Sequence, residues 1–182
     1  MTTDMIYNCF ERCGKSAKRL RETYHIDRRR PRQSKNGALD FLHDARFTLP
    51  VEDIADRRRS SHCQVYQYVF DQANPWQSSS GAHHAVDLVS LFGAIDLTFN
   101  PASARVAKDF RQRFISFARG QFPWSSQERY AFGPHGKSGV LEAGEYDLRR
   151  RTHCTKTLRE IGLSDYNLTF AALAAGRLSL LN

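Results

Sequence analysis

The feature that most constrains the fold is a six-residue strand pattern followed by a loop of small residues and a short helix. Residues 65–70 read Val-Tyr-Gln-Tyr-Val-Phe, and this run of β-branched and aromatic side chains favours a strand. Asn74-Pro75 and the Ser-Ser-Ser-Gly run at 78–81 then predict a loop. Residues 85–93 predict a short apolar helix that ends at its glycine. In an open α/β sheet, the end of such a strand is where chemistry is placed.

Further patterns predict an α/β fold around this segment. Pro101 starts a long amphipathic helix that Gly120 ends, because a proline loses no hydrogen bond at the first helical position. The other expected elements are a strand at 4–8 leading into a helix, a strand near 130–132, and helices at 150–162 and 170–181.

Composition limits the class of protein. The 182 residues suit one domain, and a hydrophobic content of 41% excludes wholesale disorder. No window approaches the ~20 apolar residues that a membrane span requires. The first 30 residues are too charged for a secretory signal peptide, and the sequence leaves the compartment open.

The chain divides into three segments by composition. Residues 1–24 are expected to form the strand and helix described above, and 64–182 carry the other elements. Between them, residues 25–63 are polar and interrupted by prolines and an Asn-Gly pair. This middle segment is expected to be a basic insertion or loop, poorly structured except for a helical turn near 38–46.

The net charge of +8 comes from 27 Lys and Arg residues against 19 Asp and Glu residues. Basic side chains cluster at 12–35, 57–59 and 149–151. Such runs neutralise phosphates, so a basic module that binds nucleic acid or an acidic partner is the alternative function. The clusters lack the aromatic interleaving of a single-strand platform, which favours solvated loop charge and disfavours nucleic acid.

Cysteine and glycosylation patterns carry little chemistry. Cys9, Cys13, Cys63 and Cys154 are too few for a disulfide scaffold, and we expect buried or free thiols. The adjacent His-Cys pairs at 62–63 and 153–154 would chelate one ion poorly, so no metal site is expected. Asn167 begins an Asn-Leu-Thr sequon, which has meaning only in an exported protein.

Two adjacent histidines, His83 and His84, stand at the end of the predicted loop. A neutral imidazole there would serve as general base and then general acid, while the alternative is a capping or core histidine.

Two other catalytic motifs are incomplete or absent. Gly136-Lys137-Ser138 lacks the leading glycine of a phosphate-binding loop, because that position is Ala131, and no Gly-x-Ser-x-Gly occurs in the chain.

The segment from residue 65 onward resembles the C-terminal region of the type B carboxylesterases, the family of the cholinesterases and many fungal esterases and lipases. The similarity lies in the Tyr-rich strand at 65–70, the Gly-x-x-His loop and the Phe-Gly close at 92–93. It continues through the helix at 101–120 to Phe-Pro-Trp at 122–124 and Tyr-Ala-Phe-Gly-Pro at 130–134. The strand-to-helix step near the amino terminus is similar as well.

The resemblance implies a fold and a site. The expected fold class is α/β, as the C-terminal fragment of an α/β-hydrolase fold with a partial sheet and flanking helices. By resemblance, His84 is the catalytic histidine of a Ser-His-Glu/Asp triad, His83 is a variable neighbour, Gly81 opens the loop, and Asp87 is a supporting acid. No cofactor is implied.

Members of this family carry the nucleophile elbow, the oxyanion loop and the triad acid in an amino-terminal part that has no counterpart here. The three components act together, so this chain is expected to be inactive alone. The expected substrate is an ester, bound once a missing N-terminal half completes the site. An exposed apolar face is expected to cause self-association. A chain without a function of its own is the remaining alternative.

Overall fold

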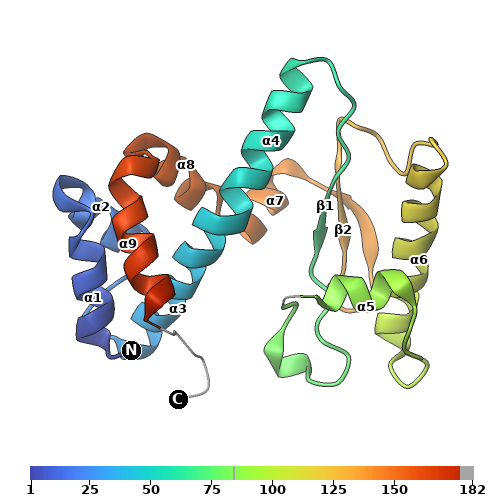
Figure 1. Ribbon diagram of the computed structural model, residues 1–182. Helices are drawn as coiled ribbons and strands as arrows, with labels where there is room; N and C mark the ends of the chain where they lie inside the picture. The colour runs from blue at the N-terminus through green and yellow to red at the C-terminus, as the bar shows by residue number, and fades with distance from the viewer. Residues whose placement is uncertain (84, 177–182) are drawn as a thin grey trace. The chain divides into compact units, whose positions relative to one another are not determined.

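The computed structural model describes residues 1–83 and 85–176, and it combines many helices with one small mixed sheet (Figure 1). The chain forms two compact units. The helical unit consists of Met1–Arg57 and the chain from Asp147 onward, and the sheet unit consists of Arg58–Tyr146. Helices and strands thus occur together, as the sequence predicts.

The helical unit contains only helical elements within its described residues. They are α1 (Thr3–Glu11), η1 (Gly14–Ser16), α2 (Ala17–Thr23), α3 (Pro31–His43), the π-helical turn η2 (Asp44–Thr48), most of α4 (Leu49–Ser60), the second half of α7 (Ala143–Arg150), α8 (Thr152–Ile161) and α9 (Leu163–Ala175). The first helix, α1, packs against the last, α9 (Figure 1). The two ends of the described chain therefore share one core.

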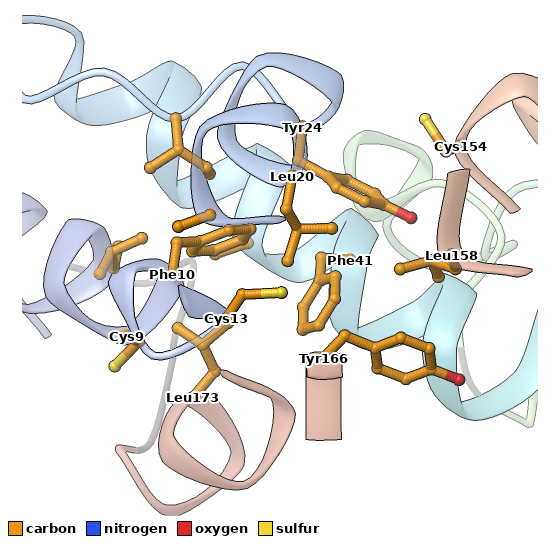
Figure 2. Close-up of a cluster of buried hydrophobic side chains, with 14 of the residues drawn as sticks. Cys9, Phe10, Cys13, Leu20, Tyr24, Phe41, Cys154, Leu158, Tyr166 and Leu173 are labelled. Carbon is orange, nitrogen blue, oxygen red and sulfur yellow. The ribbon is translucent and has the colours of Figure 1, made fainter. Parts of the chain in front are cut away.

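Aromatic and aliphatic side chains fill that core, as Figure 2 shows. Phe10 and Phe41 are completely buried, and their ring centroids lie 5.2 Å apart. Tyr166 of α9 meets Phe41 edge-on at 6.2 Å, and Leu158 of α8 is also fully buried. Each such side chain contributes about 1.5–3 kcal/mol through burial, so α8 and α9 are part of what stabilises the amino-terminal helices.

The predicted strand at 4–8 is wrong, because α1 covers these residues. Thr2 caps the helix by accepting a hydrogen bond from the Met5 N–H at 3.2 Å. The buried residues Ile6, Cys9 and Phe10 are spaced three and four apart, which places them on one helical face. A strand would have placed Ile6 and Phe10 on a face without Cys9.

The expectation of a poorly structured segment at 25–63 is also wrong, since α3, η2 and α4 span most of it. The buried face of α3 holds Ser34, Gly37 and Ala38 together with a single large side chain, Phe41. Small residues at helical spacing give almost no hydrophobic signal. A Cβ at position 37 would overlap the carbonyl oxygen of Tyr24, so close packing requires glycine there.

The sheet unit is built on three strands, β1 (Gln67–Phe70), β2 (Arg129–Phe132) and β3 (Ser138–Leu141). β1 pairs with β2 in parallel, and β2 pairs with β3 in antiparallel orientation. The helical elements are η3 (Ser78–Ser80), α5 (Val86–Phe92), α6 (Pro101–Ala118) and the first half of α7 (Ala143–Arg150). The strands near 65–70 and 130–132 and the helices near 85–93 and 101–120 are confirmed. β3 was not foreseen, because its Ser-Gly-Val-Leu sequence carries a weak strand pattern.

Each face of the sheet packs against a different element. On one face, Tyr130 and Phe132 contact Val106 and Phe110 of α6, which runs beside the strands in Figure 1. On the other face, Val69, Ala131 and Leu141 pack with Tyr146 of α7. Two-sided burial of β2 explains why its residues Tyr-Ala-Phe are all buried.

Candidate functional site

The candidate site is the segment that leaves the carboxyl end of β1. The Asp71 and Gln72 N–H groups both donate to the Phe132 carbonyl oxygen, at 2.7 and 3.1 Å. Gly133 has a φ of +91°, and a Cβ there would overlap the backbone of Gln72. Glycine is therefore required for this close approach, which fixes the point where the chain leaves the sheet.

Gln72 anchors the start of this segment to two other elements. Its buried side chain donates from Nε2 to Ser103 Oγ of α6 at 3.2 Å. Its Oε1 accepts from the Gly136 N–H at 2.9 Å. Because a buried amide left unpaired costs about 1–3 kcal/mol, these bonds hold the segment against α6 and the turn after β2.

Asn74 organises the loop that follows. Its Oδ1 accepts from the backbone N–H groups of Trp76 at 2.9 Å and Gln77 at 3.3 Å, an Asx turn. Its backbone N–H donates to the Gly81 carbonyl at 2.9 Å, which closes the loop. Its Nδ2 lies 2.8 Å from His83 Nε2. One residue therefore sets both the turn and the position of the first histidine.

The predicted site residues occupy the second half of the loop. Gly81 has a φ of +62°, and an added Cβ would meet no other atom there. Glycine is therefore favoured by the left-handed backbone conformation and not by close packing. His83 is exposed, and its Nε2 is engaged by Asn74. An amide nitrogen can only donate, so Nε2 of His83 is the acceptor in this contact. His84 lies outside the described residues, so its predicted role stays a prediction.

Asp87 lies in the first turn of α5 and is partly buried. Burial raises the pKa of the Tyr68 hydroxyl, and the Asp87 charge raises it further, so Asp87 acts electrostatically on strand β1. The helix is tied to α6 by a hydrogen bond from Arg111 Nη1 to the Ser90 carbonyl at 2.9 Å. The start of the loop and α5 are thus both attached to α6.

The cysteines and the glycosylation sequon were the other candidate features. All four cysteines are free, with Cys63 exposed and the other three buried. Asn167 is exposed on α9, while Thr169 of the same sequon is fully buried. Residues 1–83 and 85–176 contain no group of three or more His, Cys, Asp or Glu side chains arranged to hold a metal. None of the described helices has the length and apolar character to cross a bilayer.

Comparison with known proteins gives the family. A family model described as "Carboxylesterase family" matches residues 1–150, more than four fifths of the chain. The chain belongs to the carboxylesterase family. A curated relative of this carboxylesterase-family chain, Lipase 3 of Yarrowia lipolytica (strain CLIB 122 / E 150), is 29% identical over 117 residues. The match covers 62% of the present chain and 21% of the lipase. No solved structure matches.

The family match confirms the resemblance seen in the sequence. It includes the whole sheet unit, whereas α8 and α9 lie beyond residue 150. The carboxylesterase-family chain spans about a fifth of the length of the curated relative that it matches.

The sequence did not predict the anchoring roles of Gln72 and Asn74. The Asn-Pro pair at 74–75 indicated a turn, but no local pattern reveals a partner such as His83, nine residues away.

Proposed function

We propose that this chain supplies the histidine-bearing carboxyl-terminal part of a carboxylic ester hydrolase. In this proposal the sheet unit is a piece of an α/β-hydrolase fold, and β1 is the strand that precedes the catalytic histidine. The observation that carries the proposal is the family match across the complete strand–loop–helix segment. The Gly81 turn and the anchored loop after β1 support it.

The proposed roles follow from position along this segment. His84 takes the proton of an attacking nucleophile and later returns it to the leaving alcohol. Gly81 provides the backbone conformation that opens the loop. Asp87 contributes negative charge near the loop and acts on its surroundings rather than on the ester. Because Asn74 engages Nε2 of His83, His83 has a positional role in the loop.

The nucleophile, the oxyanion donors and the triad acid come from polypeptide that this sequence does not include. No Gly-x-Ser-x-Gly occurs among its 182 residues. A histidine without a nucleophile has no proton to accept, so the polypeptide alone is inactive in this proposal. Strand β1 has a hydrogen-bonded neighbour on one side only within the described sheet, and the remaining strands of the hydrolase would join at its other edge.

The first test is an assay of the isolated chain with a short-chain aryl ester. We expect no turnover above that of the His84→Ala variant. Turnover by the chain that disappears in His84→Ala would show that the site is complete without further polypeptide, and would overturn the proposed inactivity.

The second test is a chimera in which this chain replaces the matched 117-residue segment of the Yarrowia lipase. We expect ester hydrolysis that His84→Ala reduces by roughly 10³-fold or more. The matched control, His83→Ala, keeps activity within about tenfold of the parent chimera because it leaves the acid–base group in place. A folded chimera that is inactive, or one that tolerates His84→Ala, contradicts the assigned role.

A further inference from the structure

The sheet unit contains a pocket that the ester-hydrolysis proposal does not use. It lies between the face of the sheet that contacts α6 and the carboxyl-terminal half of that helix, and its volume is about 90 Å³. The pocket extends from Tyr66, just before β1, to Phe132, which pairs with Phe70 at the carboxyl end of this strand. None of the residues assigned to the histidine loop lines it.

Aromatic rings make up most of the wall. Seven of the nine lining residues are Phe, Tyr or Trp, and the other two are Arg113 and Pro123. The floor is rigid core, since Phe110 and Phe132 are 2% and 0% exposed with ring centroids 4.7 Å apart. The rim is open to solvent, because Phe114 and Phe117 are 42% and 52% exposed. The pocket thus has the mostly apolar lining of small-molecule sites, although its volume is below the roughly 300–1,000 Å³ that is usual for them.

Arg113 is the one charged residue among the nine that line the pocket, and its guanidinium is already paired. Arg113 donates from Nε to Asp109 at 3.0 Å and from Nη1 to the Pro123 carbonyl oxygen, and its guanidinium lies 3.9 Å from the Tyr130 ring centroid. An anionic ligand would compete with Asp109 for this guanidinium, and a cationic one would meet its positive charge. The pocket therefore selects an uncharged group.

Size narrows the class further. A cavity of about 150 Å³ lined by apolar side chains accommodates benzene, so a smaller space encloses only part of a ring or the end of an alkyl chain. Trp124 contributes one of the aromatic walls of this space.

We propose that this pocket binds the end of a short alkyl chain carried by an uncharged aliphatic alcohol. The proposal does not depend on ester hydrolysis, because none of the residues assigned to the reaction lines the pocket. Trp124 makes the binding observable. The second tryptophan, Trp76, lies in the loop after β1 and packs against Phe99, away from the pocket.

The test uses the full chain with Trp76→Phe, which leaves Trp124 as the single tryptophan, titrated with hexan-1-ol. We expect a saturable change in tryptophan emission, with hexylammonium and hexanoate binding at least about tenfold more weakly. Equal binding of either charged analogue, or a change that never saturates, overturns the proposal.

Variants of the rim locate the binding. The double variant Phe114→Ser, Phe117→Ser is expected to bind hexan-1-ol at least about tenfold more weakly. The control is Phe92→Ser, which changes an exposed aromatic residue on α5 and should leave the affinity unchanged. Circular dichroism checks that the double variant folds. If it does not fold, the single variant Phe117→Ser is used in its place. Unaltered affinity in the rim variants contradicts the site. Concentration-dependent association that Phe117→Ser abolishes would assign the pocket to a contact between copies and also overturn the proposal.

Discussion

Asn74 holds His83 across the loop that follows β1, with 2.8 Å between Nδ2 and Nε2. The same asparagine accepts hydrogen bonds from two backbone N–H groups through Oδ1. The side chain therefore has two separable functions, one in forming the turn and one in placing the histidine.

Asn74→Ala is expected to open the turn, because the N–H groups of Trp76 and Gln77 lose their acceptor. Hydrogen exchange at these two amides should become faster, with a cost of about 1 kcal/mol in local stability. Asn74→Asp is the matched control, since it keeps the Oδ1 acceptor of the turn and replaces the donor to His83 by a carboxylate oxygen. Slow exchange in Asn74→Ala would show that the turn forms without its side-chain acceptor.

Leu158→Ala is expected to destabilise the helical unit by about 2–5 kcal/mol, because Leu158 is fully buried among the core residues. Both tryptophans lie in the sheet unit, so their emission reports that unit alone. In urea, the far-ultraviolet circular dichroism should lose helix early while the tryptophan transition stays in place. Leu148→Ala, at an 82% exposed position, is the control and should alter neither.

A shift of the tryptophan midpoint equal to that of the helix signal would mean that the two units unfold together. That outcome would contradict their independence, which their separate hydrophobic clusters imply.

Asp44 provides a pH-dependent element in the helical unit. It is 1% exposed and accepts hydrogen bonds from Arg151, Thr48 and Tyr24. Burial raises the pKa of this carboxyl above its ordinary value of 3.8, and Arg151 opposes the rise. A carboxyl whose folded pKa is raised contributes stability that is complete below pH 3.8 and is lost as the pH rises through the folded pKa.

Arg151→Ala removes the opposing charge, so the pKa of Asp44 should rise further and the variant should be less stable at neutral pH by about 3–5 kcal/mol. The urea midpoint of the helix signal is then expected to recover as the pH falls from about 7 to 4. The double variant Arg151→Ala, Asp44→Asn should lose the extra pH dependence of the urea midpoint that Arg151→Ala shows relative to the parent protein. A pH profile for Arg151→Ala parallel to that of the parent protein would exclude Asp44 as the titrating group.

Thiol labelling should distinguish the exposed cysteine from the buried ones. Burial raises the pKa of Cys154 to about 11 and also raises the pKa values of Cys9 and Cys13, which lowers the thiolate fraction of all three. We expect an aromatic disulfide reagent to modify one thiol quickly in the native protein, and Cys63→Ser to remove that fast phase. Two or more fast thiols in the native chain would mean that the helical core opens readily.

The sequence predicts elements whose residues carry strong local signals. A run of β-branched and aromatic side chains reveals β1, and Pro101 and Gly93 mark helix ends that the structure places at α6 and α5. The fold of residues 25–63 could not be predicted in this way, because the buried face of α3 is made of Ser34, Gly37 and Ala38. That face packs because Tyr24 lies against it, and this is a tertiary contact that local sequence does not reveal.

The candidate site was predictable to a similar extent. The glycine of the loop is evident because a short run of small residues precedes a helix, and Gly81 does adopt a positive φ. The anchoring by Gln72 was not predictable, since Ser103 and Gly136 lie 31 and 64 residues further along the chain. Long-range hydrogen bonds of this kind leave no periodic trace in the sequence.

The shared core of α1 and α9 has a consequence for synthesis on the ribosome. The sheet unit is complete once residue 146 has emerged, but the helical unit must wait for α8 and α9. During that interval, roughly 2–6 seconds at ordinary elongation rates, Phe10 and Phe41 have no partner from Tyr166 or Leu158. The half that is made first is therefore the half that finishes folding last, and chaperones would meet it with its apolar face uncovered.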